Sequence, residues 1–291
     1  MNLINQTVIM SDTLNFSAEQ AINPYYADPS VDHNLAAAEH AAIYDGLTEA
    51  GVRVIKVPSP VGSQDGVYTA NWALVRGDKA VLARLPNVRK VEEDYAEKIL
   101  QDLGKTVYRV PNDWRFSGQG DSLPCGNYLF CGQAYRSDPE AQAFAADILG
   151  YTSIQLQTVP ELDSNGLPVT NSVSGWPDSF FYDIDLALAV IKAPSANENG
   201  LIAYCPEAFT DDSNAKIDQL TDIDKIIVSL DEAQHAFATN LVSTGETVVM
   251  SAHAPKLTAE LRGRGLRVIT PEVNELAKGG GYIRCTTLSL N

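Results

Sequence analysis

Basic residues are scarce in this sequence. It has 21 lysines and arginines against 37 aspartates and glutamates, which gives a formal net charge of −16 at pH 7. Nucleic acid or an anionic membrane would be repelled by that charge, so we expect neither as a partner. A cationic small molecule would be attracted instead. The sequence leaves the oligomeric state open, a homo-oligomer included.

Cysteines are few, and long apolar runs are absent. The four cysteines form no C-x-x-C pair and their spacing does not indicate zinc, so we expect no metal and no cofactor. No segment approaches the roughly 18 apolar residues of a membrane helix, and "MNLINQTVIM" lacks the features of a signal peptide. We therefore expect reduced thiols in a cytoplasmic protein.

What the sequence does contain is a local pattern that occurs five times. Each copy has a helix end, a polar break that is usually glycine, and a short apolar strand. The copies are "LTEAGVRVIKVP" (47–58), "LQDLGKTVYRVP" (100–111), "ILGYTSIQLQTVP" (148–160), "LTDIDKIIVSLDE" (220–232) and "LRGRGLRVITPEV" (261–273). In the helix before the first break, the apolar spacing predicts an inward face of Leu35, Ala38, Ala42 and Leu47.

Pairs of apolar runs joined by a turn, typical of β-hairpins, separate these copies. Four pairs occupy 65–84, 120–138, 183–205 and 237–253, and the fifth is split between 281–290 and 6–13. A chain that closes a ring often pairs its two ends in this way. The pattern predicts an α/β-propeller of five ββαβ units in a pseudo-fivefold ring. Residues 1–291 would form one domain, closed by the N- and C-terminal strands.

Polar residues recur where the hairpins start, and these starts would converge near the ring axis. The positions are Asp65 to Asn71, Gly120-Asp121, Asp183 with Asp185, Asn240, and Cys285. The stretch "FFYDIDLALAV" (180–190) is typical of a buried strand, and two aspartates on one strand face repel each other. A cationic group opposite them would explain their presence.

Cys285 follows three glycines, which permit close approach by a ligand. Its thiol would be a nucleophile if the thiolate were stabilised; an inert buried thiol is the alternative. We assign that inert role to Cys125, Cys131 and Cys205. The four histidines lie outside the polar positions and are expected to be structural or exposed. They are His33, His40, His235 and His253, with the first two on a surface helix.

Asp121 and Asp185, with Asp65 as a third member, form an acidic cluster. Carboxylates bind a guanidinium through paired, charge-assisted hydrogen bonds, which we favour over a hard metal cation here. Arg136 could hold the carboxylate of a ligand with its planar guanidinium. The alternative for Arg136 is a surface ion pair with Asp138, which would contribute little.

The motifs resemble those of the guanidino-group-modifying enzymes of the pentein fold: amidinotransferases, dimethylargininases and arginine deiminases or dihydrolases. The likeness runs nearly end to end, through "FSAEQAINPYYADPSVD", "DGVYTANWALV", "FSGQGDSL", "AYRSD", "FYDIDLALAVI", "FATN" and "GGGYIRCTTLSL". It implies a cysteine that attacks a guanidino carbon, after which the adduct passes to water in a hydrolase or to another amine in a transferase.

The resemblance also assigns residues. Cys285 matches the nucleophile, and the substrate contacts would be Asn23, Asp65, Asn71, Asp121, Arg136, Asp185 and Gly280. Among them, Asp121 and Asp185 match guanidinium-binding acids and Arg136 a carboxylate contact. Asn71 stands where classical deiminases have aspartate, which favours the amidinotransferase or dihydrolase branch.

Two positions depart from the family pattern: Asp183 replaces the histidine and Ser117 its partner glutamate. Losing the imidazole would remove general acid–base assistance of ~10²–10⁴-fold and raise the pKa of Cys285. Three interpretations follow. The protein is an enzyme in which Asp183 carries the proton, a non-catalytic protein that binds a cationic amino-acid-like ligand, or a site rebuilt for a ligand with a further positive group. A deliberate replacement of both residues would explain the same two departures. The retained Cys285 favours the first interpretation.

Overall fold

The computed structural model describes residues 3–290, and within them short strands form five three-stranded sheets. Each sheet joins an antiparallel pair to a third strand that lies parallel to the middle one. The sheets are β3 (Ala73–Arg76), β4 (Lys79–Leu82) and β5 (Thr106–Arg109); β6 (Ser122–Cys125), β7 (Tyr128–Gln133) and β8 (Thr152–Gln157); β9 (Leu188–Lys192), β10 (Gly200–Tyr204) and β11 (Ile223–Ile227); β12 (Val242–Ser243), β13 (Thr247–Val249) and β14 (Arg267–Ile269); and β15 (Leu288–Ser289), β1 (Thr7–Met10) and β2 (Arg53–Lys56).

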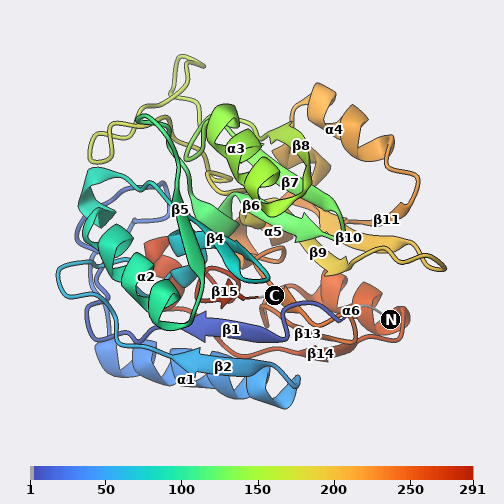
Figure 1. Ribbon diagram of the computed structural model, residues 1–291, viewed down its shortest axis with the longest axis horizontal. Coiled ribbons are helices and arrows are strands. Elements are labelled where there is room, and N and C mark those ends of the chain that lie inside the picture. The colour runs from blue at the N-terminus through green and yellow to red at the C-terminus, as the bar shows by residue number, and fades with distance from the viewer. Residues whose placement is uncertain (1–2, 291) are drawn as a thin grey trace.

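A helix connects the two parallel strands of every sheet, as the predicted ββαβ unit requires. These helices are α1 (His33–Glu49), α2 (Val91–Asp102), α3 (Pro139–Leu149), α4 (Asp211–Asp218) and α6 (Pro255–Gly263), and α5 (Leu230–Ala236) is an addition before β12. The units follow one another around the ring, with α1, α2 and α4 toward its outer side (Figure 1). No helix in residues 3–290 is long and apolar enough to cross a bilayer.

Four of the five predicted breaks are glycines in the left-handed region. Gly51, Gly104, Gly150 and Gly265 have φ values of 85°, 77°, 70° and 82°. Residues other than glycine rarely adopt this conformation, so these positions end the preceding helix and turn the chain into the third strand. The fourth unit passes from α4 to β11 without glycine, as its looser sequence indicated.

The ends of the chain meet in the fifth sheet. Strand β1 pairs antiparallel with β15, placing Ile9 opposite Leu288, and pairs parallel with β2, placing Ile9 opposite Ile55. Ile9 is fully buried and shares an apolar cluster with Trp72 of the neighbouring unit. The split hairpin therefore closes the ring. That residues 1–291 form one domain stays a prediction.

The predicted inward face of α1 is largely wrong. Of its four residues Leu47 is buried, whereas Leu35 and Ala38 are exposed and Ala42 is half-buried. The helix instead turns Glu39 and His40 inward. The Glu39 carboxylate accepts the backbone N–H groups of residues 274–276, so its burial is compensated by hydrogen bonds. Apolar spacing cannot detect an inward polar residue, and many alanines made the pattern ambiguous.

The stretch 180–190 is not the continuous strand that the sequence predicts. Ile184–Leu186 forms a 3₁₀ turn, and β9 starts after it. The Asp121 carboxylate accepts the first N–H of this turn at 3.0 Å, so that N–H does not pair with a neighbouring strand. Because of the turn, Asp183 and Asp185 do not share one strand face.

Replacement of Ile9 tests the closure of the ring. We expect Ile9→Ala to lower the free energy of unfolding by about 2–5 kcal/mol, because the deletion leaves a cavity where three strands meet. Urea unfolding measures the effect. Ile227→Ala in β11 is the control, since this side chain is 62% exposed and its loss should change stability by about 0.5 kcal/mol or less. Equal effects at the two positions would contradict the role of β1.

Candidate active site

Six of the predicted site residues line one small, enclosed cavity at the ring axis. They are Asn23, Asp65, Asn71, Arg136, Asp183 and Cys285. The cavity volume is about 20 Å³, enough for a water molecule and no more. The other three predicted residues, Asp121, Asp185 and Gly280, are not among its lining residues. The convergence of hairpin starts on the axis therefore holds for most of the set.

Hydrogen bonds fix the Cys285 thiol in place. Its sulfur accepts from the Asn240 Nδ2 at 3.1 Å and donates to the Asp185 Oδ2 at 3.5 Å. The backbone N–H of Cys285 donates to the Asn240 Oδ1 at 3.1 Å. Burial raises the thiol pKa well above its ordinary value, and the carboxylates of Asp185 and Asp183 raise it further. In the absence of a ligand, the structure favours the neutral thiol.

The glycines before Cys285 are needed for close packing. A Cβ on Gly281 would lie 2.4 Å from the Tyr68 ring, and one on Gly279 would meet the Tyr68 hydroxyl at 2.2 Å. Gly280 has a φ of 80° and packs directly on the Asn23 side chain. Asn23 also donates to the Gly279 carbonyl at 3.1 Å. Gly280 therefore shapes the wall of the cavity through its backbone.

Asp183 is held by two donors. Ser117 Oγ donates to its Oδ1 at 2.7 Å, and Asn71 Nδ2 donates to its Oδ2 at 2.6 Å. Gly120 leaves the space, because a Cβ there would lie 2.5 Å from the carboxylate. Burial raises the pKa of Asp183, while Arg136 and the two donors oppose the rise. The group is thus a fixed buried carboxyl whose proton is retained at higher pH than usual.

Asp121 and Asp185 are buried and do not line the cavity. The Asp121 Oδ1 accepts the Ile184 N–H, so this side chain positions the turn that carries the other two aspartates. Asp185 reaches the thiol, as described, and its Oδ1 has no hydrogen-bond partner. Burial, followed by the charge of Asp183, raises the pKa of both Asp121 and Asp185. Asp185 thus contacts the Cys285 thiol, whereas Asp121 acts through the backbone.

Arg136 is buried and does not form the surface ion pair that was the alternative for it. Asp138 pairs instead with Arg115 at 2.6 Å. The Arg136 guanidinium donates to the Ile22 carbonyl and lies over the Tyr182 ring, 4.9 Å from its centroid. Its Nε is buried without a partner. Arg136 therefore has a donor left for a ligand.

A second buried guanidinium, Arg89, lines the same cavity and was missed from the sequence. It pairs with Glu92 at 2.7 Å and donates to the Asn71 Oδ1 at 2.9 Å. In the sequence this arginine precedes an acidic helix start, a pattern more typical of an exposed pair. Only the packing of the ring shows that it supports Asn71.

Asp65 lines the cavity beside a tyrosine that the sequence did not single out. Its carboxylate accepts from the Tyr26 hydroxyl and from Gln64 Nε2. Burial raises the pKa of Asp65 to about 6, although Arg89 lowers it. Tyr26 and Asn23 belong to the strand-free stretch between β1 and α1, so this stretch covers the cavity.

The remaining thiols and the histidines lie elsewhere. Burial raises the pKa of Cys125 to about 12 and that of Cys205 to about 11, and raises that of Cys131 as well, which fits inert thiols. No histidine lines the cavity within residues 3–290. His33 is exposed, and His235 and His253 lie near Asp231 and Glu272. His40 faces inward, contrary to a surface position, and burial lowers its pKa to about 4.

Comparisons with known proteins identify relatives of this chain. The family model of eukaryotic N,N dimethylarginine dimethylhydrolases matches residues 15–291. The N(G),N(G)-dimethylarginine dimethylaminohydrolase of Mycobacterium tuberculosis is 31% identical over 280 residues, which cover 95% of this chain and 83% of that protein. The bifunctional arginine dihydrolase/ornithine cyclodeaminase AgrE of a Nostoc species is 28% identical over 94% of this chain, which spans 36% of that longer protein.

Solved structures confirm the predicted pentein ring. The N-terminal domain of ArgZ, a cyanobacterial arginine dihydrolase bound to its product, superposes with a TM-score of 0.85 at 26% identity, covering 98% of this chain and 97% of that one. A mutant DDAH of Pseudomonas aeruginosa complexed with citrulline gives a TM-score of 0.75 at 17% identity, covering 98% and 99%. At that identity the likeness shows the fold alone.

Replacement of Asp185 tests the electrostatics of the thiol. We expect Asp185→Asn to lower the pKa of Cys285, because a carboxylate next to a thiol disfavours the thiolate. The pH dependence of thiolate absorbance measures it, after subtraction of the Cys285→Ser signal. Asp222→Asn is the control, since Asp222 acts on Cys125 instead. An unchanged or higher pKa in Asp185→Asn would contradict the described contact.

Proposed function

The chain belongs to the N,N dimethylarginine dimethylhydrolase family of the guanidino-modifying superfamily, and on that premise we propose that it hydrolyses a C–N bond in the guanidino group of an arginine-like substrate. Cys285 is the nucleophile, and Asp183 carries the proton. The related proteins are described as hydrolases of dimethylarginine and arginine, which favours water over an amine as the acceptor.

The observation that carries the proposal is the surroundings of the Cys285 sulfur. On one side the sulfur contacts Asp185 and Asn240, and on the other it faces the cavity that Asp183 also lines. Carboxylates on both sides of a thiol make it a weak nucleophile until a cation binds between them. A guanidinium in that place would offset both charges and lower the pKa of the thiol.

The end of the substrate opposite its guanidino group is recognised by the side chain of Arg136. Arg89 already donates to Glu92, to Asn71 and to two backbone carbonyls. Arg136 retains an unpartnered Nε in the cavity wall. A carboxylate on the substrate would therefore pair with Arg136, which selects a molecule with a cationic and an anionic end.

The steps balance with these residues. With the guanidinium bound, the Cys285 thiol gives its proton to the Asp183 carboxylate, and the thiolate forms a bond to the guanidino carbon. The C–N bond to the leaving amine then breaks as that amine takes the same proton from Asp183. Asp183, now a carboxylate, accepts a proton from water, whose oxygen attacks the thiouronium carbon. The C–S bond then breaks and the thiolate leaves with a ureido product. The glutamate that orients a histidine has no equivalent task, because Ser117 and Asn71 fix Asp183 directly.

Substrate entry requires the cavity to expand. Its volume of about 20 Å³ holds no arginine-sized molecule. The stretch between β1 and α1 closes it through the contacts of Asn23 and Tyr26. This stretch contributes no strand to the five sheets, so a displacement of it would leave the strand pairing in place.

A non-catalytic ligand-binding protein is the second candidate. The raised pKa of Cys285 and the absence of a histidine among the described cavity residues favour it. In this case the pocket still binds a cationic ligand, but turnover is lost. The two candidates share the ligand and differ in the covalent step.

Covalent trapping distinguishes them. The protein is incubated with arginine, agmatine, guanidinoacetate and methylarginines, and intact mass and ureido product are measured. We expect an adduct and product with at least one carboxylate-bearing substrate. Cys285→Ser should abolish both, whereas Cys205→Ser, a buried thiol elsewhere, should retain both. Saturable calorimetric binding with neither adduct nor product across the panel would favour the binding protein.

Restoring the family's pair tests the role of Asp183. We expect Asp183→His with Ser117→Glu to increase turnover of a guanidino substrate by up to ~10²–10⁴-fold, because an imidazole is better matched to neutral pH. Asp183→His alone should gain less, since nothing orients the ring, and Asp183→Asn should lose the remaining turnover. If the double variant is inert with every substrate, the cavity serves another chemistry.

A further inference from the structure

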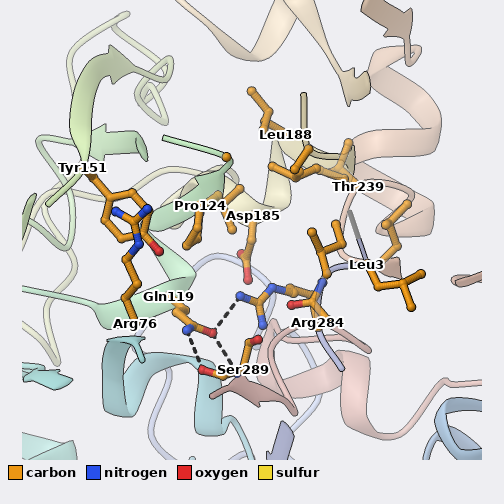
Figure 2. A pocket seen from close by; sticks show the side chains of 18 residues that line it. Leu3, Arg76, Gln119, Pro124, Tyr151, Asp185, Leu188, Thr239, Arg284 and Ser289 are labelled. Atoms are coloured by element: carbon orange, nitrogen blue, oxygen red, sulfur yellow. Dashed lines mark hydrogen bonds between the residues drawn. The ribbon is translucent and has the colours of Figure 1, made fainter. Parts of the chain in front are cut away.

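A second and larger cavity (Figure 2) is lined by Asp185, the residue that contacts the Cys285 thiol. Its volume is about 260 Å³, close to the lower bound of roughly 300 Å³ for small-molecule sites. All five ββαβ units contribute to its lining, with Arg76, Leu123, Leu188, Leu241 and Ser289 as one example from each. Its walls combine apolar side chains with polar ones, among them Gln119, Asp185 and Arg284.

The floor of this cavity holds two opposite charges that do not pair directly. Arg284 is fixed by donating to the Gln119 Oε1 and the Thr287 carbonyl, both at 2.9 Å. Asp185 extends toward its guanidinium (Figure 2). Within residues 3–290 the two groups form neither a hydrogen bond nor an ion pair with each other. A gap therefore separates a carboxylate from a guanidinium that has donors to spare.

Two buried polar atoms of the lining residues have no partner. They are the Asp185 Oδ1 and the Thr239 Oγ1, on side chains whose residues are 1% exposed. Buried polar groups are nearly always hydrogen-bonded, and leaving one unpaired is unfavourable. Both atoms can accept a hydrogen bond. A ligand that brings donors to this cavity would pair with both of them.

We propose that this cavity binds a small α-amino acid with an apolar side chain. Its ammonium would pair with Asp185 and Thr239, and its carboxylate with Arg284. A simple anion would be repelled by Asp185 and a simple cation by Arg284, so the floor selects a molecule that carries both charges. The apolar side chain would lie along Leu188 and Leu241, where burial stabilises it.

Asp185 connects this site with Cys285. One of its oxygens accepts from the thiol at 3.5 Å, and the other is the unpartnered atom. An ammonium at the free oxygen would offset the negative charge that disfavours the thiolate. The bound amino acid therefore makes Cys285 more reactive. As a regulator of turnover it rests on the proposed function, but its binding and its effect on thiol chemistry do not.

Calorimetric titration with L-leucine tests the ligand class. We expect saturable binding. Isopentylamine, which lacks the carboxylate, and 4-methylpentanoate, which lacks the ammonium, should each bind at least about tenfold more weakly, since each leaves one charge of the floor unpaired. Thr239→Val keeps the shape of the side chain and should weaken the binding of leucine about tenfold. No binding of leucine, or equal binding of the three compounds, would overturn the proposal.

Variants at the two cavities locate the site. Ala193→Trp fills the larger cavity and should abolish leucine binding, whereas Ala196→Trp, exposed in the same loop, should leave it unchanged. Arg136→Gln alters the Cys285 cavity and should also leave leucine binding unchanged. If Arg136→Gln abolishes binding and Ala193→Trp does not, leucine occupies the substrate cavity and the proposed second site is wrong.

Alkylation of Cys285 by iodoacetamide tests the coupling without any turnover. Saturating L-leucine should increase the alkylation rate severalfold at constant pH, and the increase should disappear in Ala193→Trp. A slower or unchanged rate on leucine binding would reject the coupling. A failure of guanidino hydrolysis with this result intact would count against the proposed function alone.

Discussion

The burial of three carboxylates around one axis is the constraint on which the site depends. Asp121, Asp183 and Asp185 repel one another and lose hydration, and burial raises the pKa of each. The fold compensates each in its own way. Asp121 accepts a backbone N–H, Asp183 accepts from Ser117 and Asn71, and Asp185 accepts from a thiol. Among the described residues, one oxygen of Asp121 and one of Asp185 have no partner. Their differing partners underlie the positioning role of Asp121 and the roles proposed for Asp183 in carrying a proton and for Asp185 in charge recognition.

This arrangement explains why a serine at position 117 is compatible with an aspartate at position 183. A glutamate at 117 would add a fourth carboxylate to the group, whereas the serine hydroxyl donates to Asp183 at 2.7 Å. Asn71 serves the same end by donating from Nδ2 and accepting from Arg89 through Oδ1. A chain of neutral and cationic donors thus runs from Glu92 to Asp183 and holds the Asp183 carboxyl group in place. Such a chain requires all of its members, since loss of one leaves a buried polar group unpaired.

Much of the fold could be predicted because its signals are local. Glycines such as Gly150 and Gly265 end helices by their own backbone preference, and the hairpin runs alternate with them five times. The site was predictable in part, because hairpin starts such as Asn71 and Asp183 converge once the ring closes. The turn at Ile184–Leu186 was not, since it depends on an N–H bound by Asp121 from another unit. The inward Glu39, the buried Arg89 and the larger cavity depend equally on distant partners. Local patterns carry no information about them.

The two cavities are best understood as the two sides of one layer. Cys285 and Asp183 face the smaller cavity, Arg284 faces the larger one, and Asp185 lies between the thiol and the guanidinium. Any charge brought to either side therefore acts on the same carboxylate. A guanidinium on the thiol side and an ammonium on the far side would both favour the ionised form of Asp185. Each cation would therefore favour the binding of the other until Asp185 is fully ionised. Two cations around one carboxylate also repel each other. The coupling between the sites consequently depends on two opposing effects, the attraction of both cations to Asp185 and their mutual repulsion. The unpaired oxygen of Asp185 is the atom through which a ligand in the larger cavity would change this coupling.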